Sequence, residues 1–185
     1  MIEYKVLKSQ VIKMGGYSIL PVQRSHIESI RVWRNEQMQV LRQSHHIEKQ
    51  EQEAYFTQKI WSQTESDEPS ELLLSFFLND LHIGYGGLVH ISWGNRRAEV
   101  SFLSATTRAN DASLYPDDFI AFLKIIKIMA AQQLNLNKLS SETYEFRQSH
   151  IKLLESVGFV KEGVLRQHTF LQGKPIDSIL HGCFL

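Results

Sequence analysis

The hydrophobic pattern changes its period in the middle of the chain, and this change constrains the fold more than any other feature. Residues Leu72–Leu78 form an apolar run of the kind found in buried strands. Asn79-Asp80 is a turn signal, after which Ile83–Ser92 and Ala98–Leu103 have the composition and alternation of two further strands. We therefore predict an antiparallel meander at the centre of the fold.

Helical periodicity surrounds this meander. Apolar residues recur at three- and four-residue spacing after Ser25 and along Ile47–Trp61, and Phe119–Leu134 is strongly helical. The remaining segments read, in order, as an edge hairpin or arm over residues 1–16, strands at Tyr17–Val22 and Lys138–Phe146, a short helix at Ile151–Val157 that ends at Gly158, and a hairpin of Phe159–Phe170 and Ile176–Phe184.

This order of elements predicts a single α/β (α+β) domain over residues 1–185, with one mixed, mostly antiparallel sheet and helices on both faces. Apolar residues make up 43% of the chain, which is enough for a substantial core. The chain has 20 Lys+Arg and 20 Asp+Glu, a formal net charge of +0. Nucleic acids and anionic membranes attract basic proteins, so we expect neither as a partner.

Cysteine and histidine usage excludes two further classes of protein. Cys183 is the single cysteine, so there is no intrachain disulfide framework and no cysteine-rich metal site. The histidines show no metal-ligand spacing with carboxylates, and we assign no metal. Because the N-terminus lacks a signal-peptide core and no stretch of 18 apolar residues exists, we expect a cytoplasmic protein.

Several short motifs lie in the order in which one enzyme family carries them. Gly158-Phe159 follows the short helix, Glu162-Gly163 follows that pair, and the last hairpin turns at Gly173–Asp177. Near the start, Trp33-Arg34-Asn35 lies on the first predicted helix. With its element order, the chain resembles the GNAT N-acetyltransferases over residues 17–185. The branch it most resembles acts on nucleotide-linked amino sugars and is related to the ribosomal-protein N-terminal acetyltransferases.

This resemblance implies transfer of an acetyl group from acetyl-CoA to a small-molecule amine acceptor, and it leaves a homodimer open. It implies that the strand Ala98–Leu103 splays from its neighbour and leaves a slot for the pantetheine arm. In the family, backbone groups near the end of this strand pair with that arm, here at Phe102, Leu103 and Ser104. An ordinary buried strand would have the same sequence.

The transfer needs a base for the amine and an acid for the departing thiolate. Glu99 is our first candidate for the base, against a salt bridge to a neighbouring arginine, and His90 is the second, also as a substrate-binding residue. The family often places a tyrosine where this chain has Leu154. Tyr144, His150 or water are the substitutes for the acid.

The family's phosphate-binding loop is altered here. Arg108 keeps the basic position, but Asp111 and Ser113 stand where glycines would be, and Asp117 and Asp118 follow at the helix start. Either the loop binds the coenzyme A pyrophosphate by a modified geometry or the site is weakened. Arg147 replaces a common asparagine and is expected to pair with a coenzyme A phosphate, or to be a capping or surface residue.

Trp33, Arg34 and Asn35 are the candidate acceptor-binding residues, because related enzymes build the acceptor pocket on this helix. Trp33 alternatively anchors the helix to the sheet. Three functions follow from the resemblance. The first is N-acetylation of a small amine, with a nucleotide-linked amino sugar favoured. The second is acetylation of a protein N-terminus, and the third is a non-catalytic acyl-CoA-binding module.

Overall fold

The computed structural model describes residues 1–185 and contains one eight-stranded sheet in the order β1-β2-β3-β4-β5-β6-β8-β7. All neighbouring strands are antiparallel except β5 and β6, which are parallel. The predicted mixed, mostly antiparallel sheet is confirmed. The strands are β1 (Ile12–Met14), β2 (Tyr17–Pro21), β3 (Leu72–Leu78), β4 (Leu81–Ser92), β5 (Arg97–Ser104), β6 (Lys138–Tyr144), β7 (Val160–Leu171) and β8 (Lys174–Phe184).

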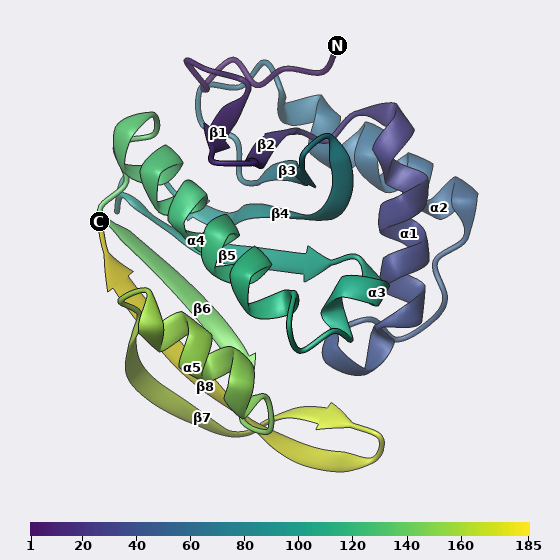
Figure 1. The fold of residues 1–185 in the computed structure, drawn as a ribbon, viewed down its shortest axis with the longest axis vertical. Helices are drawn as coiled ribbons and strands as arrows, with labels where there is room; N and C mark the ends of the chain where they lie inside the picture. The colour runs from purple at the N-terminus through teal and green to yellow at the C-terminus, as the bar shows by residue number, and fades with distance from the viewer.

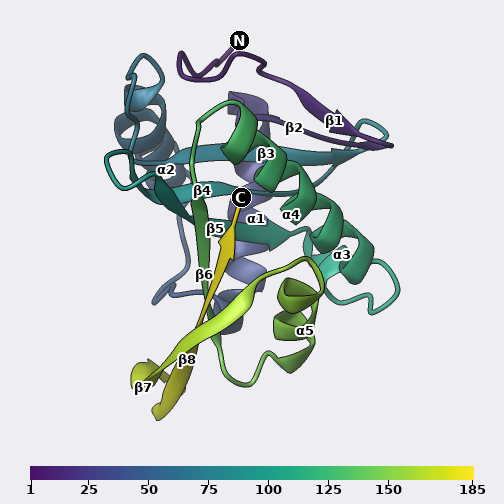
Figure 2. The ribbon, with the colours of Figure 1, turned by 90° about the vertical axis from the view of Figure 1, so that its left-hand side faces the viewer.

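Helices cover both faces of the sheet, as predicted (Figures 1 and 2). They are α1 (Ile27–Glu36), α2 (Lys49–Tyr55), α3 (Thr106–Ala109), α4 (Tyr115–Gln132) and α5 (Gln148–Ser156). Helix α4 packs on one face and α1 and α2 lie on the other. None of the helices has the length and apolar character needed to cross a membrane.

Two glycines with positive φ mark a turn and a helix end, and a buried tyrosine fixes the segment before β1. Strand β1 turns back onto β2 at Gly15, whose φ of +59° suits glycine. Tyr4, before that hairpin, is 1% exposed, and its hydroxyl accepts a hydrogen bond from the backbone N–H of Leu73 at 3.1 Å. At the other end, Gly158 has φ of +93° directly after α5, so the predicted helix stop is confirmed.

Close approach explains a glycine in β4. A Cβ on Gly86 would lie 2.1 Å from the carbonyl oxygen of Ser101 and 2.8 Å from the ring of Phe122. The missing side chain therefore lets α4 sit directly on the sheet. There Phe122 packs against Phe102 and Phe76, with ring centroids 4.5 and 5.4 Å away. This aromatic cluster fixes α4 against Phe102 of β5.

Strands β5 and β6 stay together for only part of their length. Their register contains three pairs, Arg97↔Lys138, Ala98↔Leu139 and Glu99↔Ser140. Beyond Glu99 the two strands part, while β5 keeps its pairing with β4 as far as Ser104. The predicted splay of this strand is confirmed, and Figure 2 shows β6 leaving the direction of β5.

A half-buried imidazole lies at the junction of α1 and the β3–β4 hairpin. The ring of His82 packs against Phe77, Trp33 and His26 at centroid distances of 4.9, 4.8 and 4.9 Å. Its Nε2 is buried without a hydrogen-bond partner. Burial, reinforced by the nearby His26, lowers the pKa of His82 to about 4.

This lowered pKa predicts a loss of stability in acid. Between about pH 6.5 and 4 the unfolded chain binds a proton at His82 that the folded chain does not. The free energy of unfolding therefore decreases as the pH is lowered through that window. We expect His82→Gln to reduce the difference in stability between pH 7.5 and 5 by on the order of 1 kcal/mol, allowing for partial exposure. Urea unfolding at both pH values measures this. His46→Gln, at an exposed site, should leave the difference unchanged.

Candidate active site

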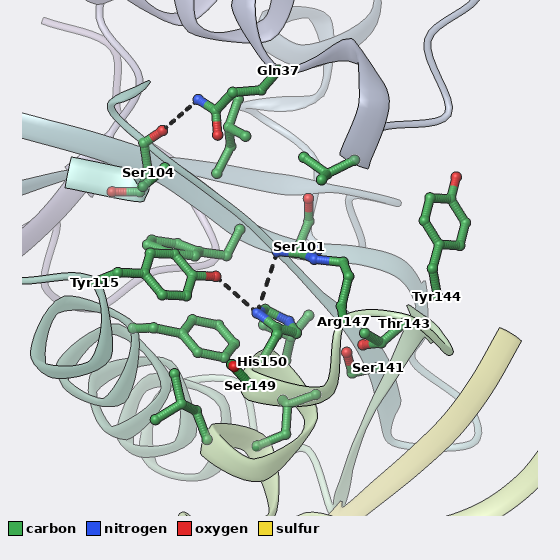
Figure 3. A pocket seen from close by; sticks show the side chains of 18 of the residues that line it. Gln37, Ser101, Ser104, Tyr115, Ser141, Thr143, Tyr144, Arg147, Ser149 and His150 are labelled. Atoms are coloured by element: carbon green, nitrogen blue, oxygen red, sulfur yellow. Dashed lines mark hydrogen bonds between the residues drawn. The ribbon is translucent and has the colours of Figure 1, made fainter. Parts of the chain in front are cut away.

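A cavity of about 890 Å³ opens where β5 and β6 part (Figure 3). Its walls come from both strands, the starts of α4 and α5, and the loop after α1. All three residues predicted to present backbone to pantetheine line it: Phe102, Leu103 and Ser104. The carbonyl oxygen of Ser104 already accepts a hydrogen bond from Gln37 Nε2 at 2.9 Å, so this carbonyl is held by the α1 side of the protein.

Glu99 lines the cavity at the point where the strands separate, and His90 stands beside it. His90 has φ of +50° at a register irregularity in β4, and its Nδ1 lies 3.0 Å from Glu99 Oε2. Glu99 is 27% exposed, whereas His90 is 70% exposed. The two candidate bases therefore form one hydrogen-bonded pair, in which Glu99 lies at the cavity and His90 lies towards solvent. Glu99 does not contact Arg96 or Arg97 in an ion pair.

A second carboxylate, missed in the sequence, faces the same side. Glu142 on β6 lines the cavity, and Arg42 from the loop after α1 forms an ion pair with it. Burial alone would raise the pKa of Glu142, but the hydrogen bond from Arg42 holds it below its usual range. Strand alternation could have indicated Glu142, whereas nothing in the loop sequence marked Arg42.

His150 and Arg147 approach the slot from the α5 side. Tyr115 Oη and Arg147 Nη2 lie 2.8 and 3.5 Å from His150 Nδ1. Both groups are donors here, so Nδ1 accepts and the ring proton is on Nε2. Burial, aided by the charge of Arg147, lowers the pKa of His150 well below its ordinary value. Figure 3 shows the side chain of Arg147 extending towards Ser101, inside the cavity.

Tyr144, the other candidate acid, lines the cavity but lies apart from this cluster. Its side chain points away from His150 in Figure 3. Thr143, the preceding residue, also lines the cavity, and its Oγ1 is buried without a partner. An amide of a pantetheine arm would satisfy such an orphaned hydroxyl, so this part of the cavity fits the acetyl donor.

The loop before α4 does not offer a free anion cradle. Asp111 Oδ1 accepts hydrogen bonds from the N–H of Ser113 at 2.8 Å, from the N–H of Leu114 at 3.3 Å and from Ser113 Oγ at 2.6 Å. The chain's own carboxylate therefore occupies the donors that would face a phosphate in a glycine-rich loop. Of the two readings of this loop, the weakened site is the one that the geometry favours.

Arg108 requires a correction. Its Nε and Nη2 donate to Asp118 at 2.5 and 2.7 Å, and the same carboxylate accepts from Tyr17 Oη at 3.1 Å. Asp118 is completely buried, and Arg108 does not line the cavity. A buried carboxylate without a partner is costly, so the contacts of Arg108 with Asp118 stabilise the fold, and no contact directs Arg108 towards the expected cofactor site.

Trp33, Arg34 and Asn35 also lie outside the cavity. Trp33 packs against the core. Arg34 donates to Tyr85 Oη at 2.8 Å, and Asn35 Oδ1 accepts from the N–H of Ile47 at 2.8 Å. The first contact ties α1 to β4, and the second holds the loop between α1 and α2. The expectation that the three residues bind the acceptor directly is not supported, because none of them lines the cavity and the contacts of Arg34 and Asn35 are made within the fold.

Comparison with known proteins agrees with this geometry. A family model described as an acetyltransferase (GNAT) domain matches residues 19–180. The chain belongs to the GNAT acetyltransferase family. It is accordingly an N-acetyltransferase that uses acetyl-CoA. A comparison with curated proteins found no significant match.

Solved structures share the fold of this GNAT protein. One is spermidine N-acetyltransferase from Vibrio cholerae in complex with CoA and spermine, with a TM-score of 0.78 and 19% identity over 92% of this chain and 96% of that chain. Another is a dodecameric structure of the same enzyme in an intermediate state, with a TM-score of 0.75 and 18% identity over 92% and 95%. At this identity the likeness shows the fold alone.

The self-occupied loop predicts an unusual response to mutation. Asp111→Asn keeps the hydrogen-bond acceptor but removes the charge, and Asp111→Gly also frees the amides. We expect acetyl-CoA to bind several-fold more tightly to the first variant and about tenfold more tightly to the second, about 1.4 kcal/mol. Calorimetric titration measures both. Asp117→Asn removes a charge from the same turn without touching the loop amides and should change the affinity least; equal affinities for all four proteins would contradict the prediction.

Proposed function

We propose that the protein transfers the acetyl group of acetyl-CoA to a small primary amine that is bound on the Glu99 side of the gap between β5 and β6. The observation that carries this proposal is the position of Glu99. It is the last β5 residue paired with β6, so it lies where the gap opens and lines the cavity there. A base at this place meets an amine approaching a thioester held in the gap.

The proposed reaction is direct. Glu99 takes a proton from the ammonium form, and the neutral nitrogen attacks the thioester carbon. The carbon–sulfur bond then breaks, and the thiolate receives a proton as free coenzyme A leaves. His90 accepts the proton from Glu99 and passes it to solvent. Neutral His150 positions the pantetheine arm by its Nε2–H, which leaves Tyr144 or water as the acid.

The acceptor is better supported as a simple amine than as a nucleotide-linked amino sugar. The sugar was expected from Trp33, Arg34 and Asn35, but these side chains lie outside the cavity: Trp33 packs against the core, and Arg34 and Asn35 bond within the fold. The Arg42–Glu142 bridge crosses the acceptor side of the cavity, which favours a small acceptor over the end of a polypeptide. The Vibrio cholerae enzyme that shares the fold holds spermine, an amine of this simple kind.

The third expected function, a non-catalytic acyl-CoA-binding module, is not retained, because the chain is an N-acetyltransferase. Asp111 nevertheless fills the phosphate loop, so binding of the donor has its own test. Acetyl-CoA at 100 times its Kd should raise the free energy of unfolding by about 2.7 kcal/mol, a shift of roughly 5–10 °C in melting temperature for a chain of this size. A coenzyme A release assay with amines then measures turnover. No thermal shift with acetyl-CoA, or a shift without release in the presence of any amine, would contradict the proposed transfer.

Glu99→Gln tests the base. We expect kcat/KM to fall by about 100-fold at pH 7, because the amine is then mostly protonated and the base is lost. The loss should shrink above pH 9, where the amine deprotonates without help. His90→Gln, which leaves Glu99 in place, should lose less than tenfold. A Glu99→Gln profile parallel to wild type at every pH would remove Glu99 from the mechanism.

A further inference from the structure

Two carboxylates flank the gap on its acceptor side, one from each parting strand. Glu99 belongs to β5 and Glu142 to β6, and Glu99 pairs with Ser140. Glu142 lies two residues beyond Ser140 and therefore on the same face of β6, about 7 Å further along the strand. Both line the cavity. The acceptor side thus has two separate positions at which a cation is favoured.

The chain itself supplies a cation to the second position. Arg42 reaches Glu142 from the loop after α1, and His168 Nε2 is also near, at 3.9 Å. The two partners of the ion pair differ in burial, since Glu142 is 12% exposed and Arg42 is 54% exposed. The carboxylate is therefore fixed in the wall, whereas the guanidinium has solvent around it and can turn outward without losing hydration.

We propose that Glu142 binds a second cationic group of the acceptor, and that Arg42 occupies this carboxylate until the acceptor displaces it. The inference rests on the proposed acetyl transfer and narrows its acceptor to an amine with a second positive charge a short alkyl chain away. One ammonium then meets Glu99 and loses its proton, and the other replaces the guanidinium at Glu142.

The opposite assignment, in which Arg42 binds an anionic group of the acceptor, fits the charges less well. Such an anion would lie between Glu99 and Glu142, and both would repel it. It would also have to remove Arg42 from a carboxylate that is largely buried, which leaves that carboxylate unpaired. A cationic group replaces Arg42 instead and keeps Glu142 neutralised.

Three acceptors that differ only in the charge of their tail test the proposal. The assay measures coenzyme A release with 1,4-diaminobutane, butylamine and 4-aminobutyrate. We expect kcat/KM to be at least about tenfold higher for the diamine than for butylamine, and lowest for 4-aminobutyrate. A ratio near one for diamine and butylamine, or preference for 4-aminobutyrate, would overturn the proposal.

Variants assign the effect to its residues. Glu142→Gln should bring the ratio of kcat/KM for the diamine to that for butylamine close to one, chiefly by lowering kcat/KM for the diamine. Arg42→Gln should lower KM for the diamine. Lys152→Gln, which removes a cavity cation on α5, should leave the ratio unchanged. An unchanged ratio in Glu142→Gln would contradict the proposal.

Calorimetry with 1,4-diaminobutane separates this inference from the proposed function, because it needs no turnover. Wild-type protein should bind the diamine, and Glu142→Gln should bind it at least about tenfold more weakly. Binding with this pattern but without coenzyme A release would retain the cation site and reject the transfer. Equal rates of coenzyme A release with butylamine and with the diamine, together with equal affinity of wild type and Glu142→Gln for the diamine, would retain the transfer and reject the cation site.

Discussion

The early end of pairing between β5 and β6 is the constraint on which the rest of the structure depends. β5 makes seven pairs with β4, and β6 makes seven with β8, but the two strands share only three with each other. Each strand therefore follows its other neighbour, and the sheet divides between them. Unpaired backbone groups along such a gap are costly unless a ligand or water satisfies them, so the division itself favours an extended polar ligand.

The division also separates charges. Arg147 and Lys152 line the cavity from α5, on the side where α4 packs. Glu99 and Glu142 face the other side, towards the loop after α1. In the proposed reaction, a polyanionic donor and a cationic amine would therefore meet across the gap from surfaces of opposite sign. The ring of His150 stacks on Phe119 at a centroid distance of 4.2 Å, which ties α5 to α4 beside the gap.

Periodic signals in the sequence predicted the fold well, because burial on one or two faces sets the period. Leu72–Leu78 is a strand with the predicted bounds, and alternation placed Glu99 opposite its apolar neighbours. Contacts made by loops left no such signal. Arg108 was expected beside a phosphate, and only tertiary packing showed that Asp118 is its partner. The contact of Arg42 with Glu142, 100 positions apart in sequence, was invisible for the same reason.

In the loop before α4, Asp111 keeps the loop folded but removes the attraction for an anion that glycines provide in the family motif. Glycines expose backbone N–H groups to a phosphate, whereas Asp111 turns the same groups inward onto its own carboxylate. The loop stays ordered, but its attraction for an anion is already satisfied. We therefore propose that affinity for acetyl-CoA arises from the pantetheine arm in the gap and from Arg147 and Lys152, which line the cavity. On this proposal the donor would be held mainly near its reacting end, where the parted strands and Thr143 offer unsatisfied polar groups.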